Sequence, residues 1–285
     1  MTSATGEEIG RAAQEGRLII TDYPYIPRPR PFATSRGGGI IHGLLEAARP
    51  RFSSICRSML EDAASFRRIP IHNGGPADPT PGWVNGMQPA LDGMLLYTLT
   101  RTLNPRVYLE VGSGNSTKFV RRAILDHKLR TRVVSIDPNP RADIDALCDE
   151  VIRQPFEDIP DTRYRSLLSA GDMVFIDNSH RAFQNSDVTV FFCEVLPALP
   201  SGVFYGVHDI FLPDDYPAEW ADRYYNEQYL LVSYLLGGAG GDRIVFPGIF
   251  VSRDPASSQM LQPLFGDPYF AETSPHSGGF WLEKA

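Results

Sequence analysis

Four side chains that can exchange protons or bind a metal ion follow two short apolar segments of the sequence. Asp177 and His180 come directly after the first segment, and His208 and Asp209 come directly after the second. Both segments have the pattern of buried strands, and neighbouring parallel strands end at the same edge of a sheet, so the four side chains are expected at one mouth. Histidines grouped with carboxylates at such an edge indicate a catalytic site.

His180 is the predicted general base, because a histidine whose pKa lies near neutrality can accept the proton of a hydroxyl group. Asp177 is expected to orient this histidine or to stabilise its charge. In the rival interpretation His208 accepts the proton, and His180 contacts a cofactor or caps a helix. A divalent metal ion is a further alternative, with Asp177, His208 and Asp209 as its ligands. A histidine beside carboxylates favours Mn²⁺, Fe²⁺ or Zn²⁺ over Mg²⁺.

A second group of candidate residues lies in a glycine turn. Residues 107–111 have the pattern of a buried strand that only Glu110 interrupts, and two glycines follow it. Glycine permits a tight turn and close approach of the backbone to a ligand. The next residues are typical helix caps, so a helix N-terminus should direct free amide groups into the turn. The turn therefore predicts a cofactor site made by Glu110, Gly112, Ser113, Gly114, Asn115 and Ser116.

Asp137 ends the next predicted strand and is the candidate ligand of a ribose. A carboxylate at this position commonly accepts hydrogen bonds from ribose hydroxyls, although an aspartate before Pro138 can also serve only to form the turn. A dinucleotide fold would require a third glycine, but Thr117 stands at that position, which disfavours it. An oxidoreductase with a nucleotide cofactor is therefore the alternative enzyme class. A cofactor-binding protein without catalytic activity is a third hypothesis.

The elements that position these residues alternate between strand and helix from residue 106 onward, which predicts an α/β fold with a largely parallel sheet covered by helices. A long helix rich in tyrosine is expected at residues 218–236. Apolar runs predict strands at residues 107–111, 132–136, 151–154, 173–176, 203–207, 243–251 and 278–282.

Residues 1–80 are expected to form an N-terminal arm and a helical extension, and residues 81–285 the main domain. The arm should cover residues 1–38, which are polar, then rich in proline, and end in three glycines. Residues 40–66 have the apolar spacing of two amphipathic helices that Pro50 separates.

The composition restricts the class of partner. The chain has 285 residues, of which 42% are hydrophobic, and a formal net charge of −7. It can bury a full core, but it lacks the clustered cationic side chains that bind nucleic acid. No apolar run is long enough to span a membrane and no targeting pattern opens the chain, so a cytoplasmic protein is expected. Three distant cysteines favour a reducing compartment. The oligomeric state is left open, and a homo-oligomer is compatible with the sequence.

These motifs resemble those of the class I S-adenosylmethionine-dependent methyltransferases. Residues 109–116 resemble the first motif of that family, and residues 135–138 its ribose-binding strand end. Residues 172–180 resemble its fourth motif, and residues 202–209 the following strand of small-molecule O-methyltransferases. The resemblance covers about residues 83–285.

The resemblance implies a Rossmann-like sheet of seven strands, flanked by helices, whose last two strands form an antiparallel hairpin. It implies S-adenosylmethionine as the cofactor, with its methionine part over the glycine turn and its ribose on Asp137. The adenine is expected beside Phe156, where core packing is an equal alternative, and Asp177 should also contact the cofactor. The methyl group would pass to a hydroxyl of a small metabolite or glycan.

Some members of that family hold Mg²⁺ between the fourth-strand aspartate and an Asp-Asn or Asp-Asp pair after the fifth strand. This chain departs from them with His208 and Asp209. The segment 211–220 and the tyrosine-rich helix that contains Tyr225 and Glu227 are expected to overhang the site. They are candidate acceptor-binding elements, or they pack or form a dimer surface.

Overall fold

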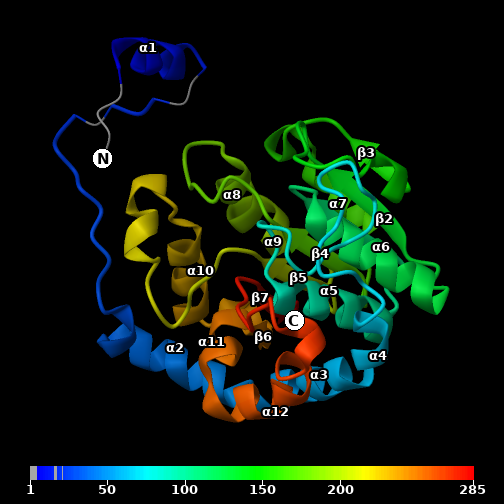
Figure 1. Cartoon of the computed structure of the whole chain (residues 1–285). Helices are drawn as coiled ribbons and strands as arrows, with labels where there is room; N and C mark the ends of the chain where they lie inside the picture. The colour runs from blue at the N-terminus through cyan, green and yellow to red at the C-terminus, as the bar shows by residue number, and fades with distance from the viewer. Residues whose placement is uncertain (1–4, 16–17, 21) are drawn as a thin grey trace.

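The computed structural model describes residues 5–15, 18–20 and 22–285 (Figure 1). These residues form one sheet of seven strands, in the spatial order β3-β2-β1-β4-β5-β7-β6. Strands β1 to β5 are parallel, whereas β7 is antiparallel to both of its neighbours. The strands are β1 (Val107–Val111), β2 (Arg132–Ile136), β3 (Glu150–Ile152), β4 (Met173–Ile176), β5 (Phe204–Val207), β6 (Arg243–Pro247) and β7 (Phe280–Glu283). The predicted seven-stranded α/β sheet is confirmed.

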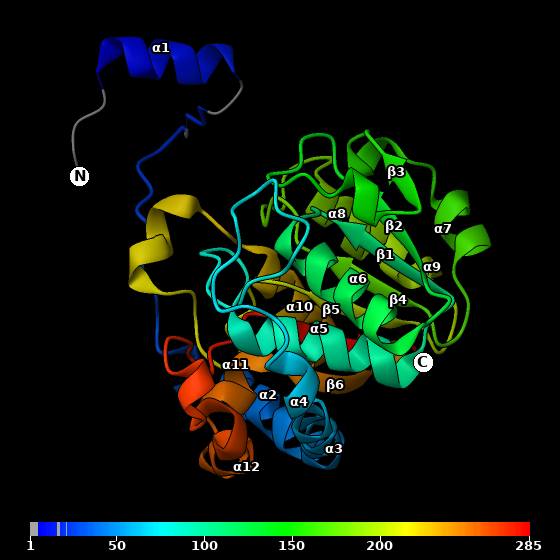
Figure 2. The ribbon, with the colours of Figure 1, turned by 45° about the vertical axis from the view of Figure 1, so that its right-hand side comes forward.

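Helices cover both faces of this sheet, as expected for parallel strands that are buried throughout. In Figure 2, α5 (Ala90–Leu103) and α6 (Asn115–His127) lie in front of the sheet, where they pack against each other. Behind it lie α8 (Asp187–Val190), α9 (Leu196–Ala198) and α10 (Glu227–Leu236). Every residue of β1 and β4 is buried. The shorter helix α7 (Asp161–Leu167) precedes β4.

The helical extension packs on the edge of the sheet that β6 forms. It consists of α2 (Arg36–Ala47), α3 (Arg49–Glu61) and α4 (Ala63–Phe66). Helices α2 and α3 contact β6, and α3 also packs on α5. Phe52 and Met59 are fully buried in the same core as the sheet. Pro50 lies in the first turn of α3, where proline is tolerated, so the predicted break is confirmed. The domain boundary at residue 80 stays a prediction.

The predicted N-terminal arm contains more helix than expected. Part of it, residues 1–4, 16–17 and 21, lies outside the described residues. Helix α1 (Gly6–Gln14) starts at a capping box formed by Thr5 and Glu8, and it stands away from the body of the protein (Figures 1 and 2). Helix α2 begins at Arg36, so the three glycines lie inside it. Gly38 is required there because a Cβ atom would lie 2.1 Å from the Phe32 carbonyl oxygen.

The strand predicted at residues 243–251 is correct only to Pro247. The chain continues as α11 (Gly248–Arg253), because a short apolar run can be either a strand or a buried helix and its pattern does not separate them. Helices α11 and α12 (Pro255–Phe265) lie between β6 and β7 in the sequence. These two strands are therefore antiparallel neighbours, but they are not joined by a tight hairpin turn.

The helix predicted at residues 218–236 is divided into two. The 3₁₀ helix η5 (Ala218–Arg223) ends where Tyr224 adopts a left-handed conformation with φ 55°, and α10 begins after Asn226. A single left-handed residue leaves no trace in hydrophobic spacing, which explains the wrong prediction. No helix in the described part of the chain is long and apolar enough to cross a membrane.

Candidate active site

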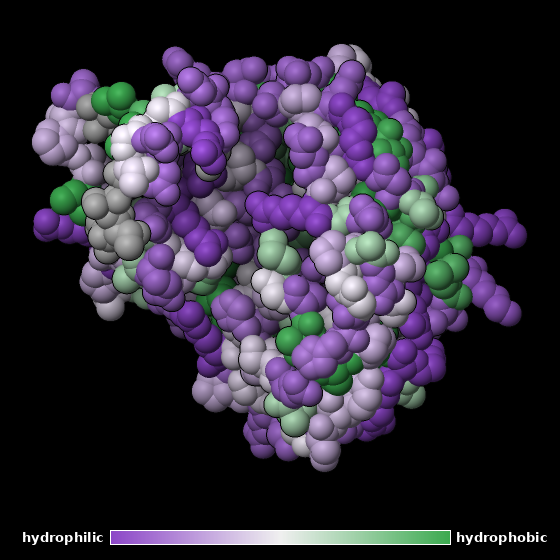
Figure 3. Space-filling model, turned by 45° about the horizontal axis from the view of Figure 1, so that its top comes forward, coloured by the Kyte–Doolittle hydropathy of each residue, from purple (hydrophilic) through white to green (hydrophobic). Residues whose placement is uncertain are grey.

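A cavity of about 980 Å³ lies at the carboxyl ends of β1, β2, β4 and β5. Its volume reaches the upper end of the range for small-molecule sites, which leaves room for a cofactor and a second ligand. In Figure 3 the surface is hollowed, and mainly hydrophilic residues border the hollow. The cavity therefore lies at the predicted edge of the sheet.

The glycine turn after β1 forms part of the cavity wall, as predicted. Gly112, Ser113, Gly114, Asn115 and Ser116 all line the cavity. Gly112 has φ +80°, and a Cβ atom there would lie 1.7 Å from the carbonyl oxygen of Asp177, so only glycine fits. A Cβ atom at Gly114 would meet no protein atom within 4 Å, so this position faces open space.

Asp137 lines the cavity after β2 and also fixes the turn. Its two carboxylate oxygens accept hydrogen bonds from the amides of Ser113 (3.0 Å) and Asn139 (2.7 Å). The ribose-binding and turn-forming interpretations are thus compatible, because each oxygen retains a second lone pair. Phe156 lines the cavity but is 3% exposed and packs on Tyr164, with the ring centroids 5.2 Å apart.

Glu110 lies behind the turn and is fully buried outside the cavity lining. Its oxygens accept hydrogen bonds from the hydroxyls of Tyr108, at 2.7 Å, and Thr117. The Thr117 hydroxyl in turn accepts a hydrogen bond from the Gly114 amide. Burial raises the pKa of Glu110 to about 7. The residue therefore supports the turn through Thr117.

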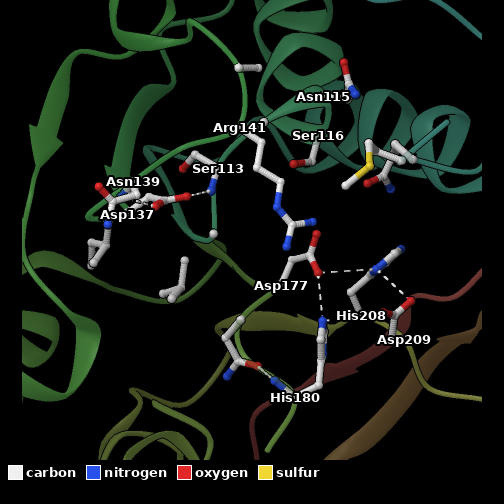
Figure 4. A pocket seen from close by; sticks show the side chains of 18 of the residues that line it. Ser113, Asn115, Ser116, Asp137, Asn139, Arg141, Asp177, His180, His208 and Asp209 are labelled. Atoms are coloured by element: carbon white, nitrogen blue, oxygen red, sulfur yellow. Dashed lines mark hydrogen bonds and ion pairs between the residues drawn. The ribbon is translucent and has the colours of Figure 1, made fainter. Parts of the chain in front are cut away.

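The four side chains predicted to converge lie together and line the cavity (Figure 4). His180 Nε2 lies 3.3 Å from an oxygen of Asp177 and 3.4 Å from one of Asp209. His208 Nδ1 lies 3.5 Å from the same Asp177 oxygen and 3.4 Å from the other Asp209 oxygen. Two imidazoles and two carboxylates thus alternate around one point of the cavity.

Behind each imidazole lies a buried carboxylate. Sequence reasoning placed Glu227 only on an element that overhangs the site, and it did not place Asp92 there. Glu227, at the start of α10, accepts a hydrogen bond from His180 Nδ1 at 2.9 Å. Asp92, on α5, lies 3.2 Å from His208 Nε2 and also accepts the backbone amide of Gly278. Each carboxylate orients its imidazole so that the other ring nitrogen faces the cavity. Asp92 gave no signal, because it sits within an apolar helix pattern.

The carboxylates determine the charge of the histidines. Burial acts to lower the pKa of His180, but hydrogen bonds to Asp177 and Glu227 outweigh it and hold that pKa well above its usual value. The pKa of His208 is raised in the same way, chiefly by Asp177. Burial acts to raise the pKa of Asp177, but the two imidazoles hold it well below its usual value.

The predicted metal site receives no support from this arrangement. Among the described residues, no group of three or more His, Cys, Asp or Glu side chains is arranged to hold a metal ion. Both aspartates face ring nitrogens of both histidines. The ligand set of Asp177, His208 and Asp209 stays a prediction.

One wall of the cavity comes from the segment that was expected to overhang the site. Trp220, Arg223 and Tyr225 line the cavity there, and the Tyr225 ring lies 4.6 Å from the His180 ring. Another wall comes from residues 73–88, between the helical extension and α5, and Arg141 reaches into the cavity after β2 (Figure 4). Sequence reasoning missed the wall from residues 73–88 and the contribution of Arg141, because turn-rich segments carry no periodic signal.

Comparison with known proteins matches residues 109–210 to the family model described as a methyltransferase domain. The matched segment contains the glycine turn, Asp137 and all four side chains of the histidine and aspartate cluster. No curated protein matches the chain at a significant level.

Several solved structures are similar to the chain. The methyltransferase PaMTH1 of Podospora anserina, bound to S-adenosylhomocysteine, is 15% identical over 84% of this chain and 96% of its own, with a TM-score of 0.42. Cofactor-bound Rv0187 from MTB is 16% identical over 81% and 89%, with a TM-score of 0.38. The mycinamycin-pathway methyltransferase MycE, with Mg and S-adenosylhomocysteine, is 15% identical over 65% and 47%, with a TM-score of 0.36.

Proposed function

We propose, from the match of residues 109–210 to a methyltransferase domain and from the seven-stranded sheet, that the chain is an S-adenosylmethionine-dependent methyltransferase that methylates a hydroxyl oxygen of a small metabolite or glycan unit. The observation that carries the proposal is the pairing of His180 with Glu227 at the cavity. A sugar or alcohol hydroxyl requires a base as its oxygen attacks the methyl group. A histidine that a carboxylate holds in one orientation can act as that base.

The chain's own residues fit the cofactor. The turn from Gly112 to Ser116 would hold its methionine part, and Asp137 has free lone pairs for a ribose. When bound, the cofactor supplies a methyl group on a positively charged sulfur, which departs as a neutral thioether. The protein therefore has to align the acceptor and receive its proton.

We assign the proton to Nε2 of His180. Glu227 occupies Nδ1, so Nε2 is the nitrogen that faces the cavity. The hydroxyl proton would move to Nε2 of the deprotonated imidazole as the oxygen is methylated, and Asp177 and Asp209 would stabilise the imidazolium that results. Because the pKa of His180 is raised, the deprotonated form is the minor one at neutral pH.

We call the wall that Trp220, Arg223 and Tyr225 form the acceptor wall. His180 is favoured over His208 because its ring contacts Tyr225 on this wall, whereas the ring of His208 packs against Phe175 of the core.

Glutamine substitutions test this assignment. His180→Gln should lower turnover about 10²- to 10⁴-fold, the usual contribution of a general base, and leave the affinity for S-adenosylhomocysteine unchanged. His208→Gln tests the rival, and His42→Gln, at an exposed residue of α2 outside the cavity lining, is the matched control. A His180 variant that turns over normally, or that fails because the cofactor no longer binds, would overturn the assignment.

A further inference from the structure

Arg223 carries a positive charge on the acceptor wall and has no acidic partner in the described part of the chain. It lines the cavity, and no carboxylate of the described residues lies within ion-pair distance of its guanidinium. Its Cζ lies 3.8 Å from the centroid of the Trp220 ring and 5.6 Å from that of Tyr225. Stacking on the indole holds the planar guanidinium in place and leaves its in-plane N–H donors available.

Two neighbouring arginines, Arg253 and Arg181, do not share this property. Arg253, at the end of α11, forms an ion pair with Asp214 of the segment 211–220. Arg181 also lies over the Tyr225 ring, with its Cζ 5.0 Å from the centroid, but it donates to the backbone carbonyls of Ser179 and Arg223. Arg181 therefore fixes the segment, and Arg223 keeps donors for a ligand.

Three anionic side chains of the cavity have other partners. Asp177 and Asp209 face the two imidazoles, and Asp187 accepts hydrogen bonds from the amide and hydroxyl of Ser179. Tyr225 contacts both the predicted base and the arginine of the acceptor wall, because its ring packs against His180 and also against the Arg223 guanidinium. Both groups therefore border the same part of the cavity, beside the Tyr225 ring.

We infer that the methyl acceptor carries a carboxylate or phosphate group that Arg223 binds, about one ring away from the hydroxyl that faces His180. This inference rests on the proposed function and names its substrate class. A guanidinium binds either anion through paired hydrogen bonds, so the structure assigns the charge and the test separates its two sources. Arg223 is thus a residue that determines acceptor specificity.

Glucose, glucuronate and glucose 1-phosphate are suitable probes, since they share hydroxylated rings and differ in charge. Binding to the protein saturated with S-adenosylhomocysteine is measured by calorimetry, and methyl transfer is measured as S-adenosylhomocysteine release. One of the anions should bind about 10- to 100-fold more tightly than glucose, as expected for a charge-assisted hydrogen-bonded pair. The stronger of the two identifies the anion class.

Arg223→Gln should remove this preference and leave glucose binding and cofactor affinity unchanged. Arg130→Ala, an exposed arginine on the loop before β2, is the control and should preserve the preference. Equal binding of the three probes to the wild type, or a preference that survives Arg223→Gln, would overturn the inference. Arg223-dependent anion binding without any methyl transfer would keep the inference and count against the proposed hydroxyl methylation.

Discussion

The same substitution at the two glycines of the turn after β1 should affect two different properties, the stability of the fold at Gly112 and the affinity for the cofactor at Gly114. Gly112→Ala adds a methyl group 1.7 Å from the carbonyl oxygen of Asp177, at a residue with φ +80°. A left-handed residue other than glycine costs roughly 1–2 kcal/mol, and overpacking of a tight contact costs about 1–3 kcal/mol more. We therefore expect a loss of roughly 2–5 kcal/mol in the free energy of unfolding.

Gly114→Ala should leave the fold intact, because its added methyl group meets no protein atom within 4 Å. That open space belongs to the cavity, so the methyl group should obstruct the cofactor instead. We expect S-adenosylhomocysteine to bind at least about 10-fold more weakly, which is about 1.4 kcal/mol.

Urea unfolding gives the stability of both variants, and calorimetry gives the affinity for S-adenosylhomocysteine. For a chain of this size, the Gly112 variant should melt roughly 3–8 °C lower than the wild type. A Gly112 variant of unchanged stability would refute the packing argument. A Gly114 variant of unchanged affinity would refute the position assigned to the cofactor.

Three further results are expected. Asp137→Ala should weaken S-adenosylhomocysteine binding by on the order of 1–3 kcal/mol, and unchanged calorimetric affinity in a folded variant would remove Asp137 from the ribose site. Burial raises the pKa of Glu110 from its ordinary value of 4.5 to about 7 in the folded protein. The contribution of this carboxyl to the free energy of unfolding is therefore fully present below pH 4.5 and is lost as the pH rises through 7. Urea unfolding should show that Glu110→Gln lacks this decline, about 3 kcal/mol by pH 8, and identical pH profiles would contradict it. If a divalent ion takes part, chelation should abolish turnover until Mn²⁺ or Mg²⁺ is restored, and the Asp209→Asn variant should not recover; turnover that survives chelation removes the metal from the mechanism.

Most of the parallel half of the fold could be predicted from the sequence. Strands β1, β2 and β4 have the predicted bounds, since each is a short apolar run that glycine or aspartate ends. Their ends also indicated Gly112, Asp137, Asp177 and His180, because side chains that follow parallel strands meet at one edge.

The parts that failed depend on single residues or on distant partners. The left-handed Tyr224 divides a helix that the spacing predicted as continuous. Glu227 and Asp92 reach the histidines from helices far away in the sequence, and only tertiary packing brings them there. Arg223 differs from other exposed arginines only in what surrounds it, which the sequence does not record.

The position of a labelled methyl group tests the account most directly. S-adenosylmethionine with a ¹³C-labelled methyl group is incubated with the enzyme and with hydroxylated anions such as glucuronate and glucose 1-phosphate, and the products are analysed by carbon NMR. The account predicts the label as a methoxy carbon on the acceptor, formed together with an equal amount of S-adenosylhomocysteine and lost in His180→Gln. A label on nitrogen or carbon, or equal methoxy formation in the His180 variant, would contradict it.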